Sequence, residues 1–151
     1  MYDGDVTDLF SQGAADLAEE ARRLLLEIDG EHAGTAATTA DCRPPLDVIE
    51  TPLSVDIVID VPGVPAELLR VVVTRNTLLV VGSKPDTRVE NGGRFHIAER
   101  GHGRFARVVR LAGAFDAARA RAVVDRGQLR VSLPVLEERR GRVLNIPVTR
   151  A

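Results

Sequence analysis

Two hydrophobic periods divide the chain. Between residues 7 and 29, apolar side chains recur every three or four positions, which is the spacing of one helix face. Charged residues occupy the other faces, and Gly30 follows where a helix typically ends. From residue 46 the period changes to two, as expected for a strand with one buried face. The pattern predicts an amphipathic helix followed by a β domain. The apolar face of the helix contains Phe10, Ala14, Leu17, Ala21, Leu24, Leu25 and Ile28.

Short strands separated by tight turns follow the helix. In residues 53–61 an apolar set alternates with polar residues, from Leu53 through Val61. Segments 69–74 and 77–82 flank Arg75-Asn76, which predicts a hairpin. Residues 104–111 predict another strand, and residues 120–134 a second hairpin turned at Arg126-Gly127. Six or more such strands favour an all-β fold, an antiparallel immunoglobulin-like β-sandwich.

The composition changes along the chain predict three parts. Residues 1–45 form an N-terminal arm, in which the helix is followed by a small, polar, proline-ended linker at 30–45. Residues 46–136 form the sandwich. Residues 137–151 form a flexible C-terminal extension, which begins with the charged stretch EERRGR and ends with apolar side chains on either side of Pro147. We expect the helix and the extension to lie outside the sandwich.

Composition excludes several functions. A net charge of −2 gives no basic excess for nucleic acid. No apolar run approaches the ~20 residues of a membrane span, and the mixed charges on the polar face of the helix argue against a membrane surface. The first ten residues lack the basic-then-apolar order of a secretory signal, so we expect a cytoplasmic protein.

No catalytic, cofactor-binding or metal-binding set is apparent in the sequence. Cys42 is the single cysteine, which excludes an internal disulfide. His32, His96 and His102 have no metal-ligand spacing. We therefore predict that the protein is not an enzyme and needs no cofactor.

A series of motifs carries a family resemblance. DVIET, VDIVIDVPGV, LLVVGSK, HIAERGHGRFARVVRL, DRGQLRVSLP and IPV occur in this order, over residues 46–134 and the tail. This combination resembles the small heat shock protein (Hsp20/α-crystallin) family. Ala112, Gln128 and an arm with few aromatic residues depart from the family pattern. The resemblance implies an ATP-independent holdase chaperone of the stress response, a homo-oligomer that binds unfolding proteins. The alternative is a p23-like sandwich that recruits one specific partner.

The tail motif Ile146-Pro147-Val148 is suited to edge addition. Proline holds the backbone extended, so residues 146 and 148 project on the same side and can add to an open sheet edge. By resemblance, the motif enters a groove of a neighbouring dimer between segments 69–74 and 119–125. The alternative is a frayed tail. The groove residues implied are Leu69, Val71, Val73 and Val123.

Arg107 lies among apolar neighbours in its strand, because it shares a face with Phe105 and Val109. A buried guanidinium needs a carboxylate or carbonyl partner. By resemblance, Arg107 belongs to a dimer interface, with Glu99 and Arg100 fixing the preceding loop. The alternative is an arginine bonded within its own subunit.

The polar segment 83–96 is long for a hairpin connection. By resemblance, it contains a strand at 94–97, with Phe95 and Ile97, that crosses to the partner subunit; the alternative is a plain loop. The helical arm needs a partner or the sandwich to cover its apolar face. We expect self-association or client binding there, and packing against the core is the alternative. The arm residues implied are Phe10, Leu17, Leu24, Leu25 and Ile28.

Overall fold

The computed structural model describes residues 14–29, 42–74, 76–136 and 143–151, which form one α-helix and ten strands. The helix α1 spans Ala14–Asp29, so residues 7–13 of the predicted helix lie outside the described residues. The strands are β1 (Leu46–Glu50), β2 (Ser54–Asp60), β3 (Leu69–Thr74), β4 (Thr77–Lys84), β5 (Gly103–Arg110), β6 (Ala114–Phe115), β7 (Arg121–Asp125), β8 (Gln128–Leu136), β9 (Val143–Ile146) and β10 (Val148–Arg150).

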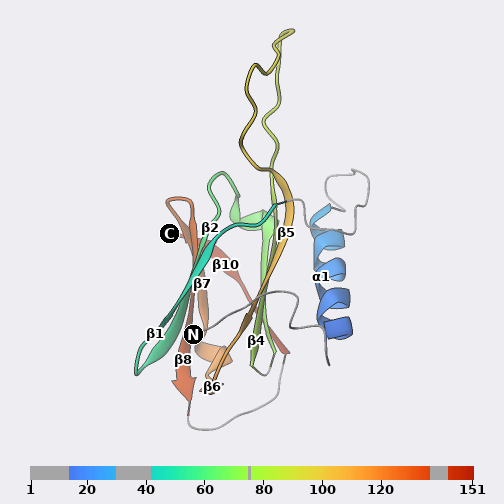
Figure 1. The fold of residues 1–151 in the computed structure, drawn as a ribbon. Coiled ribbons are helices and arrows are strands. Elements are labelled where there is room, and N and C mark those ends of the chain that lie inside the picture. The colour runs from blue at the N-terminus through green and yellow to red at the C-terminus, as the bar shows by residue number, and fades with distance from the viewer. Residues whose placement is uncertain (1–13, 30–41, 75, 137–142) are drawn as a thin grey trace.

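The strands form two sheets packed face to face (Figure 1). One sheet has the order β1-β2-β8-β7-β10, with β6 pairing to β8, and the other has the order β5-β4-β3-β9. All pairs are antiparallel except β10 with β7. The predicted antiparallel β-sandwich is confirmed.

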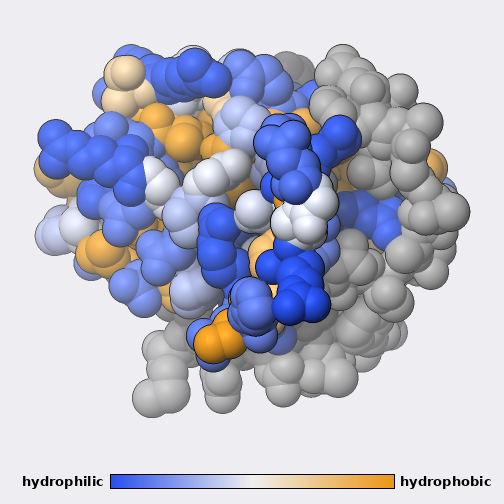
Figure 2. All heavy atoms as spheres, turned by 90° about the horizontal axis from the view of Figure 1, so that it is seen from above, coloured by the Kyte–Doolittle hydropathy of each residue, from blue (hydrophilic) through white to orange (hydrophobic). Residues whose placement is uncertain are grey.

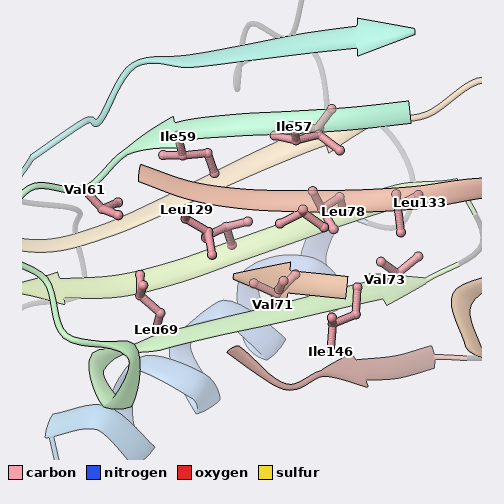
Figure 3. Packing of buried hydrophobic residues seen from close by; sticks show 14 of the residues in the cluster. Ile57, Ile59, Val61, Leu69, Val71, Val73, Leu78, Leu129, Leu133 and Ile146 are labelled. Atoms are coloured by element: carbon pink, nitrogen blue, oxygen red, sulfur yellow. The ribbon is translucent and has the colours of Figure 1, made fainter. Parts of the chain in front are cut away.

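The core lies between the sheets and follows the alternation of the sequence. On β2, Val55, Ile57 and Ile59 are at most 1% exposed, while the residues between them are partly accessible. They pack with the inward residues of the facing sheet, such as Val71 and Leu78 (Figure 3). This is the period-two pattern expected for two inner sheet faces. Leu53 breaks it: β2 begins at Ser54, and Leu53 lies in the preceding turn, 81% exposed.

The second predicted hairpin turns at the expected residues. Arg126 and Gly127 both have positive φ, 49° and 76°, as two-residue turns between right-twisted strands require. The absence of a side chain at Gly127 also avoids a close contact, because a Cβ there would lie 3.3 Å from the Cα of Pro62. The β7–β8 connection is therefore specified locally.

The predicted linker 30–45 ends earlier than expected. The amide of Cys42 donates to the carbonyl of Arg104, and the amide of Asp60 donates to the carbonyl of Pro45. Cys42 is half-buried against the core. Backbone hydrogen bonding therefore attaches residues 42–45 to the sandwich, and residues 30–41 lie outside the described part.

Both terminal parts contact the sandwich, although the pattern places them outside it. Helix α1 lies along the outer face of the sheet containing β4 and β5 (Figure 1). Residues 143–150 of the extension form β9 and β10 at the open edges of the two sheets. The physical reason is that an apolar helix face and an unpaired strand edge are both stabilised by being covered.

The segment between β4 and β5 projects from one end of the sandwich (Figure 1). Residues 85–102 are in neither helix nor strand, and all of them are exposed. Seen from this end, hydrophilic side chains predominate, with separate hydrophobic patches between them (Figure 2). In the described residues, no helix has the length and apolar content to cross a membrane.

Candidate functional site

The C-terminal tail closes the open side of the sandwich. Strand β9 pairs antiparallel with β3, with Ile146 opposite Val71, and β10 pairs parallel with β7, with Val148 opposite Ala122. Pro147 stands between the two strands, where the chain passes from one sheet to the other. A residue without an N–H suits this position, because neither ladder needs a donor there. The tail therefore bridges both sheet edges.

Ile146 is the most buried of the tail side chains that the structure describes, at 145–151. Its side chain is 4% exposed and lies toward Val71 and Val73 (Figure 3). Val148 is half-buried against the same core, and Pro147 is exposed. Fully burying one such aliphatic side chain contributes about 1.5–3 kcal/mol, while ordering each tail residue costs about 1–2 kcal/mol. The contact is therefore weak enough to be reversible.

Three of the predicted groove residues, Leu69, Val71 and Val73, are buried on β3 in the core that Ile146 joins. Val123 is half-buried on β7 opposite Thr149 and does not belong to this core, whereas its neighbours Ala122 and Val124 pack there. The expectation that the tail enters the groove of another copy stays a prediction, because tail and groove here belong to one chain. A depression of about 500 Å³ adjoins the tail between α1 and β3, and Arg23, Glu67 and Pro147 are among its lining residues.

Arg107 is buried among apolar side chains, as its position in the strand predicts. It is 9% exposed on β5, opposite Val80. Its Nη1 donates to the carbonyl oxygen of Pro44, and its buried Nε has no hydrogen-bond partner in the described part of the chain. Burial, and secondarily the positive charge of Arg43, lowers the pKa of Arg107 below its ordinary value. A buried cation beside a second cation favours the approach of a carboxylate.

The segment leading to Arg107 is fastened at its base. Arg100 Nη1 donates to Thr87 Oγ1 at 2.9 Å, and His102 Nδ1 lies 3.5 Å from Asp86 Oδ1. Both contacts join the outgoing and returning parts of the projection. The role of Arg100 in fixing this loop at a dimer interface stays a prediction. Glu99 is exposed. Phe95 and Ile97 are also exposed, at 55% and 77%, and residues 94–97 pair with no strand in the described part of the chain.

Three of the five predicted arm residues pack on the outer face of the sheet that contains β3 and β4. Leu24 and Ile28 are buried and Leu25 is half-buried against Val72, Leu79 and Val81 on the outer sheet face. Phe10 lies outside the described residues, as does the side chain of Leu17. The signal for this surface is the uninterrupted apolar run at 71–73 and 78–81, since a strand buried on both faces does not alternate.

Among residues 14–29, 42–74, 76–136 and 143–151, no group of three or more His, Cys, Asp or Glu side chains is arranged to hold a metal ion. The features of the described site are instead those of association. They are an edge groove with its filling strand, a buried cation, and exposed aliphatic and aromatic side chains on a projection.

Two short sheets whose open side receives a proline-containing tail define an α-crystallin-type sandwich. The model of the Hsp20/alpha crystallin family matches residues 47–149. The chain belongs to this family, as the motifs predict.

Known proteins of similar sequence and structure are heat shock proteins. The chain is 29% identical to the 16.9 kDa class I heat shock protein 1 of Triticum aestivum, over 96% of this chain and 95% of the relative. It is 31% identical to the 18.9 kDa heat shock protein of Oryza sativa subsp. japonica, over 78% and 67%. Heat shock protein 16.0 from Schizosaccharomyces pombe superposes with a TM-score of 0.61 and 28% identity, over 67% of this chain and 94% of that chain.

Family membership decides two of the sequence-based predictions. The family is non-enzymatic, so the prediction that the chain is not an enzyme is confirmed. The family is typically oligomeric, which agrees with the predicted self-association in its general form. A rice relative is described as peroxisomal, so a cytoplasmic location stays a prediction.

Proposed function

We propose that the protein is an ATP-independent holdase chaperone of the cytoplasm, which assembles as dimers into a larger homo-oligomer and binds unfolding proteins under stress. The observation that carries this proposal is the tail contact, in which a short strand with one deeply buried isoleucine fills an apolar edge groove. When the tail leaves, β3 and β7 present unpaired backbone groups beside apolar side chains. Exposed segments of unfolding proteins also combine unpaired backbone groups with apolar side chains, so they can pair with the same edges.

In this proposal the tail of one copy enters the groove of another. The contacts of Ile146 and Val148 are the same whichever copy supplies the groove, so docking within a chain and between chains compete. Each contact is weak, but several tails acting together hold an assembly through effective concentration. Heat shifts this balance toward open grooves and therefore toward client binding.

The dimer is proposed to form through β5 and the projection. Arg107 carries a buried charge with an unpaired Nε, and a carboxylate from a second copy would neutralise it. Among the described residues, β1 is the last strand of its sheet and pairs with β2. It offers a pairing site for residues 94–97 of a second copy, whose Phe95 and Ile97 are exposed in the single chain.

The test is a comparison of assembly with aggregation suppression. The purified chain is expected to run as a particle larger than a dimer by light scattering. At an equimolar ratio, without nucleotide, it is expected to delay heat-driven aggregation of a labile test protein. A chain that stays dimeric and leaves that aggregation unchanged would contradict the proposal and favour the single-partner binding module.

A further inference from the structure

The sheet formed by β5-β4-β3-β9 is apolar on both faces. Toward the core it presents Val71, Val73, Leu78 and Val80, and on the opposite face Val72, Leu79 and Val81 are at most 2% exposed. The outer side of a sandwich sheet normally carries polar residues that meet water. This outer face therefore requires a cover. Ala106 and Val108 of β5 extend it as half-buried members of the same cluster.

Helix α1 supplies the cover. Leu24 and Ile28, four positions apart on one helix face, are 2% and 3% exposed, and Ala21 and Leu25 pack beside them. Leu26, on another face of the helix, is 58% exposed. These contacts form a cluster separate from the sandwich core. The outer face is thus a docking surface for a helix with aliphatic residues at positions i and i+4.

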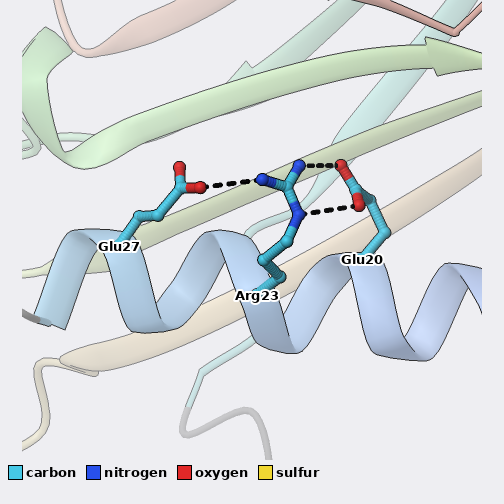
Figure 4. Close-up of polar contacts among 3 residues, drawn as sticks. All are labelled: Glu20, Arg23 and Glu27. Carbon is cyan, nitrogen blue, oxygen red and sulfur yellow. Dashed lines mark hydrogen bonds and ion pairs between the residues drawn. The ribbon is translucent and has the colours of Figure 1, made fainter.

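The charged side chains of α1 form ion pairs within the helix itself. Arg23 bonds Glu20 through two nitrogen atoms, at 3.0 and 2.5 Å, and Glu27 through a third at 2.9 Å (Figure 4). Arg22 pairs with Glu19 at 3.1 Å. These ion pairs do not depend on the sheet, so they persist when the helix leaves it.

The helix remains tethered when it leaves. Residues 30–41 separate α1 from Cys42, and twelve residues reach at most about 40 Å when extended. A released helix therefore stays close and returns quickly, and an incoming helix must compete with it. This arrangement makes the face a reversible binding surface.

We propose that the outer face of β3, β4 and β5 is a receptor for amphipathic aliphatic helices. It is occupied by α1 at rest and by helical segments of unfolding proteins after α1 leaves. The second half of this inference rests on the proposed holdase function. The surface is distinct from the edge groove, because the tail contacts the inward side of β3 through Ile146 while α1 contacts the outward side at Val72.

The first experiment measures helix binding without any client. A fluorescein-labelled peptide of residues 14–29 is titrated into the full chain, into a Leu24→Ala/Ile28→Ala variant, and into a Leu26→Ala control. Weakening the resident helix removes its competition, so the double variant is expected to bind the peptide at least about tenfold more tightly than the other two chains. Equal binding by all three chains overturns the inference. Circular dichroism checks that each chain keeps its β signal.

A second pair of variants locates the peptide. Val108→Lys, placed on the outer face in the Leu24→Ala/Ile28→Ala background, is expected to abolish peptide binding. Val123→Lys in the same background alters the edge near the tail and is expected to leave peptide binding unchanged. The reverse result places the peptide away from the outer face of β3, β4 and β5 and overturns the inference.

Aggregation assays separate this inference from the function on which it rests. The Leu24→Ala/Ile28→Ala variant is expected to protect a labile test protein at a lower temperature than the Leu26→Ala control does, and the free peptide is expected to reduce that protection. If the peptide binds but no chain protects the test protein, the proposed holdase function is contradicted and the proposed helix-binding surface is not. If the chain protects the test protein, and neither the Leu24→Ala/Ile28→Ala substitutions nor the peptide alters that protection, the client-binding role of this surface is contradicted and the holdase function is not.

Discussion

Gly82 is a tightly packed point of the core at the scale of single residues. It stands between Leu69 and Phe105 as the cross-strand partner of both. A Cβ at Gly82 would lie 2.4 Å from Cζ of Phe105 and 2.8 Å from Cδ2 of Leu69. The missing side chain is what allows a phenyl ring to fill the space between the sheets at this point.

Gly82→Ala is expected to lower the free energy of unfolding by about 1–3 kcal/mol, because the added methyl overpacks the core. In a Phe105→Leu background, which vacates space, the same substitution is expected to cost clearly less. Urea denaturation of the four chains measures both effects. Gly101→Ala is the matched control, since its Cβ would meet only Cys42 at 3.7 Å. Equal midpoints for the Gly82 and Gly101 variants would contradict this account of the core.

Arg107 either bonds only within its own subunit or pairs with a carboxylate of a second copy, and one substitution distinguishes these two arrangements. If Arg107 bonds only to Pro44 of its own chain, replacing it by methionine removes a costly buried charge and is neutral or stabilising. If a carboxylate of a second copy pairs with it, Arg107→Met leaves that carboxylate unpaired. The proposed dimer predicts the second outcome, with a dimer dissociation constant raised at least about a hundredfold.

Sedimentation equilibrium measures the effect of Arg107→Met. The background is a chain carrying Ile146→Gly and Val148→Gly, so that tail contacts do not contribute. Arg110→Met, at the exposed end of the same strand, is the control and is expected to leave the dissociation constant unchanged. A dimer as strong with Arg107→Met as with Arg110→Met would place Arg107 among residues that act within one subunit.

At the scale of elements, the projection 85–102 and strand β1 are complementary. The projection presents Phe95 and Ile97 to solvent, and β1 is an edge strand that pairs only with β2 among the strands described. Contacts at the base, from Arg100 to Thr87 and from His102 to Asp86, hold the two arms of the projection together. A segment that is held at its base and exposed along its length is suited to pair outside its own chain.

Phe95→Gly with Ile97→Gly is expected to weaken the dimer at least about tenfold, because two apolar side chains lose the burial they gain only between copies. The free energy of unfolding of the sandwich itself is expected to stay the same. Val89→Gly removes an exposed apolar residue of the same projection and serves as the control. Equal dissociation constants for the two chains, by analytical ultracentrifugation, would indicate a plain loop.

At the scale of the whole molecule, the sandwich has two apolar surfaces and the chain carries a cover for each. The tail covers the edge between β3 and β7, and α1 covers the outer face of β3, β4 and β5. Strand β3 takes part in both contacts, through Val71 on one side and Val72 on the other. Assembly and client binding are therefore expected to respond together when either cover is weakened.

Ile146→Gly with Val148→Gly is expected to reduce the particle to dimers, because the tail then loses both apolar anchors and gains backbone freedom. Light scattering after size-exclusion chromatography measures the particle mass. Asn145→Gly with Thr149→Gly adds the same flexibility at exposed tail positions and is the matched control. An unchanged mass in the Ile146/Val148 variant would remove the tail from the assembly mechanism.

Local patterns in the sequence were enough to predict most of the sandwich. The alternation along β2 and β8 identifies which side chains face the core, and Arg126-Gly127 places the turn before β8. These features depend on neighbours one to four residues apart. Strands β1 and β6 were not predicted, because they are short and owe their conformation to partners far along the chain. The tail was predicted to add to a sheet edge as one strand, but not to form β9 and β10 on two different sheets.

The candidate site also has features that the sequence predicts and features that depend on the tertiary structure. The sequence by itself determined that Arg107 lies on an apolar strand face, that Ile146 and Val148 suit an open edge, and that α1 has one apolar side. The family resemblance already implied the edge between segments 69–74 and 119–125. The tertiary structure alone decided that the tail of this chain pairs with both β3 and β7, and that the sheet under α1 is apolar on both faces. The physical reason is that hydrophobicity and strand edges create a need for burial without specifying the partner. Only the packed arrangement of distant segments supplies that partner.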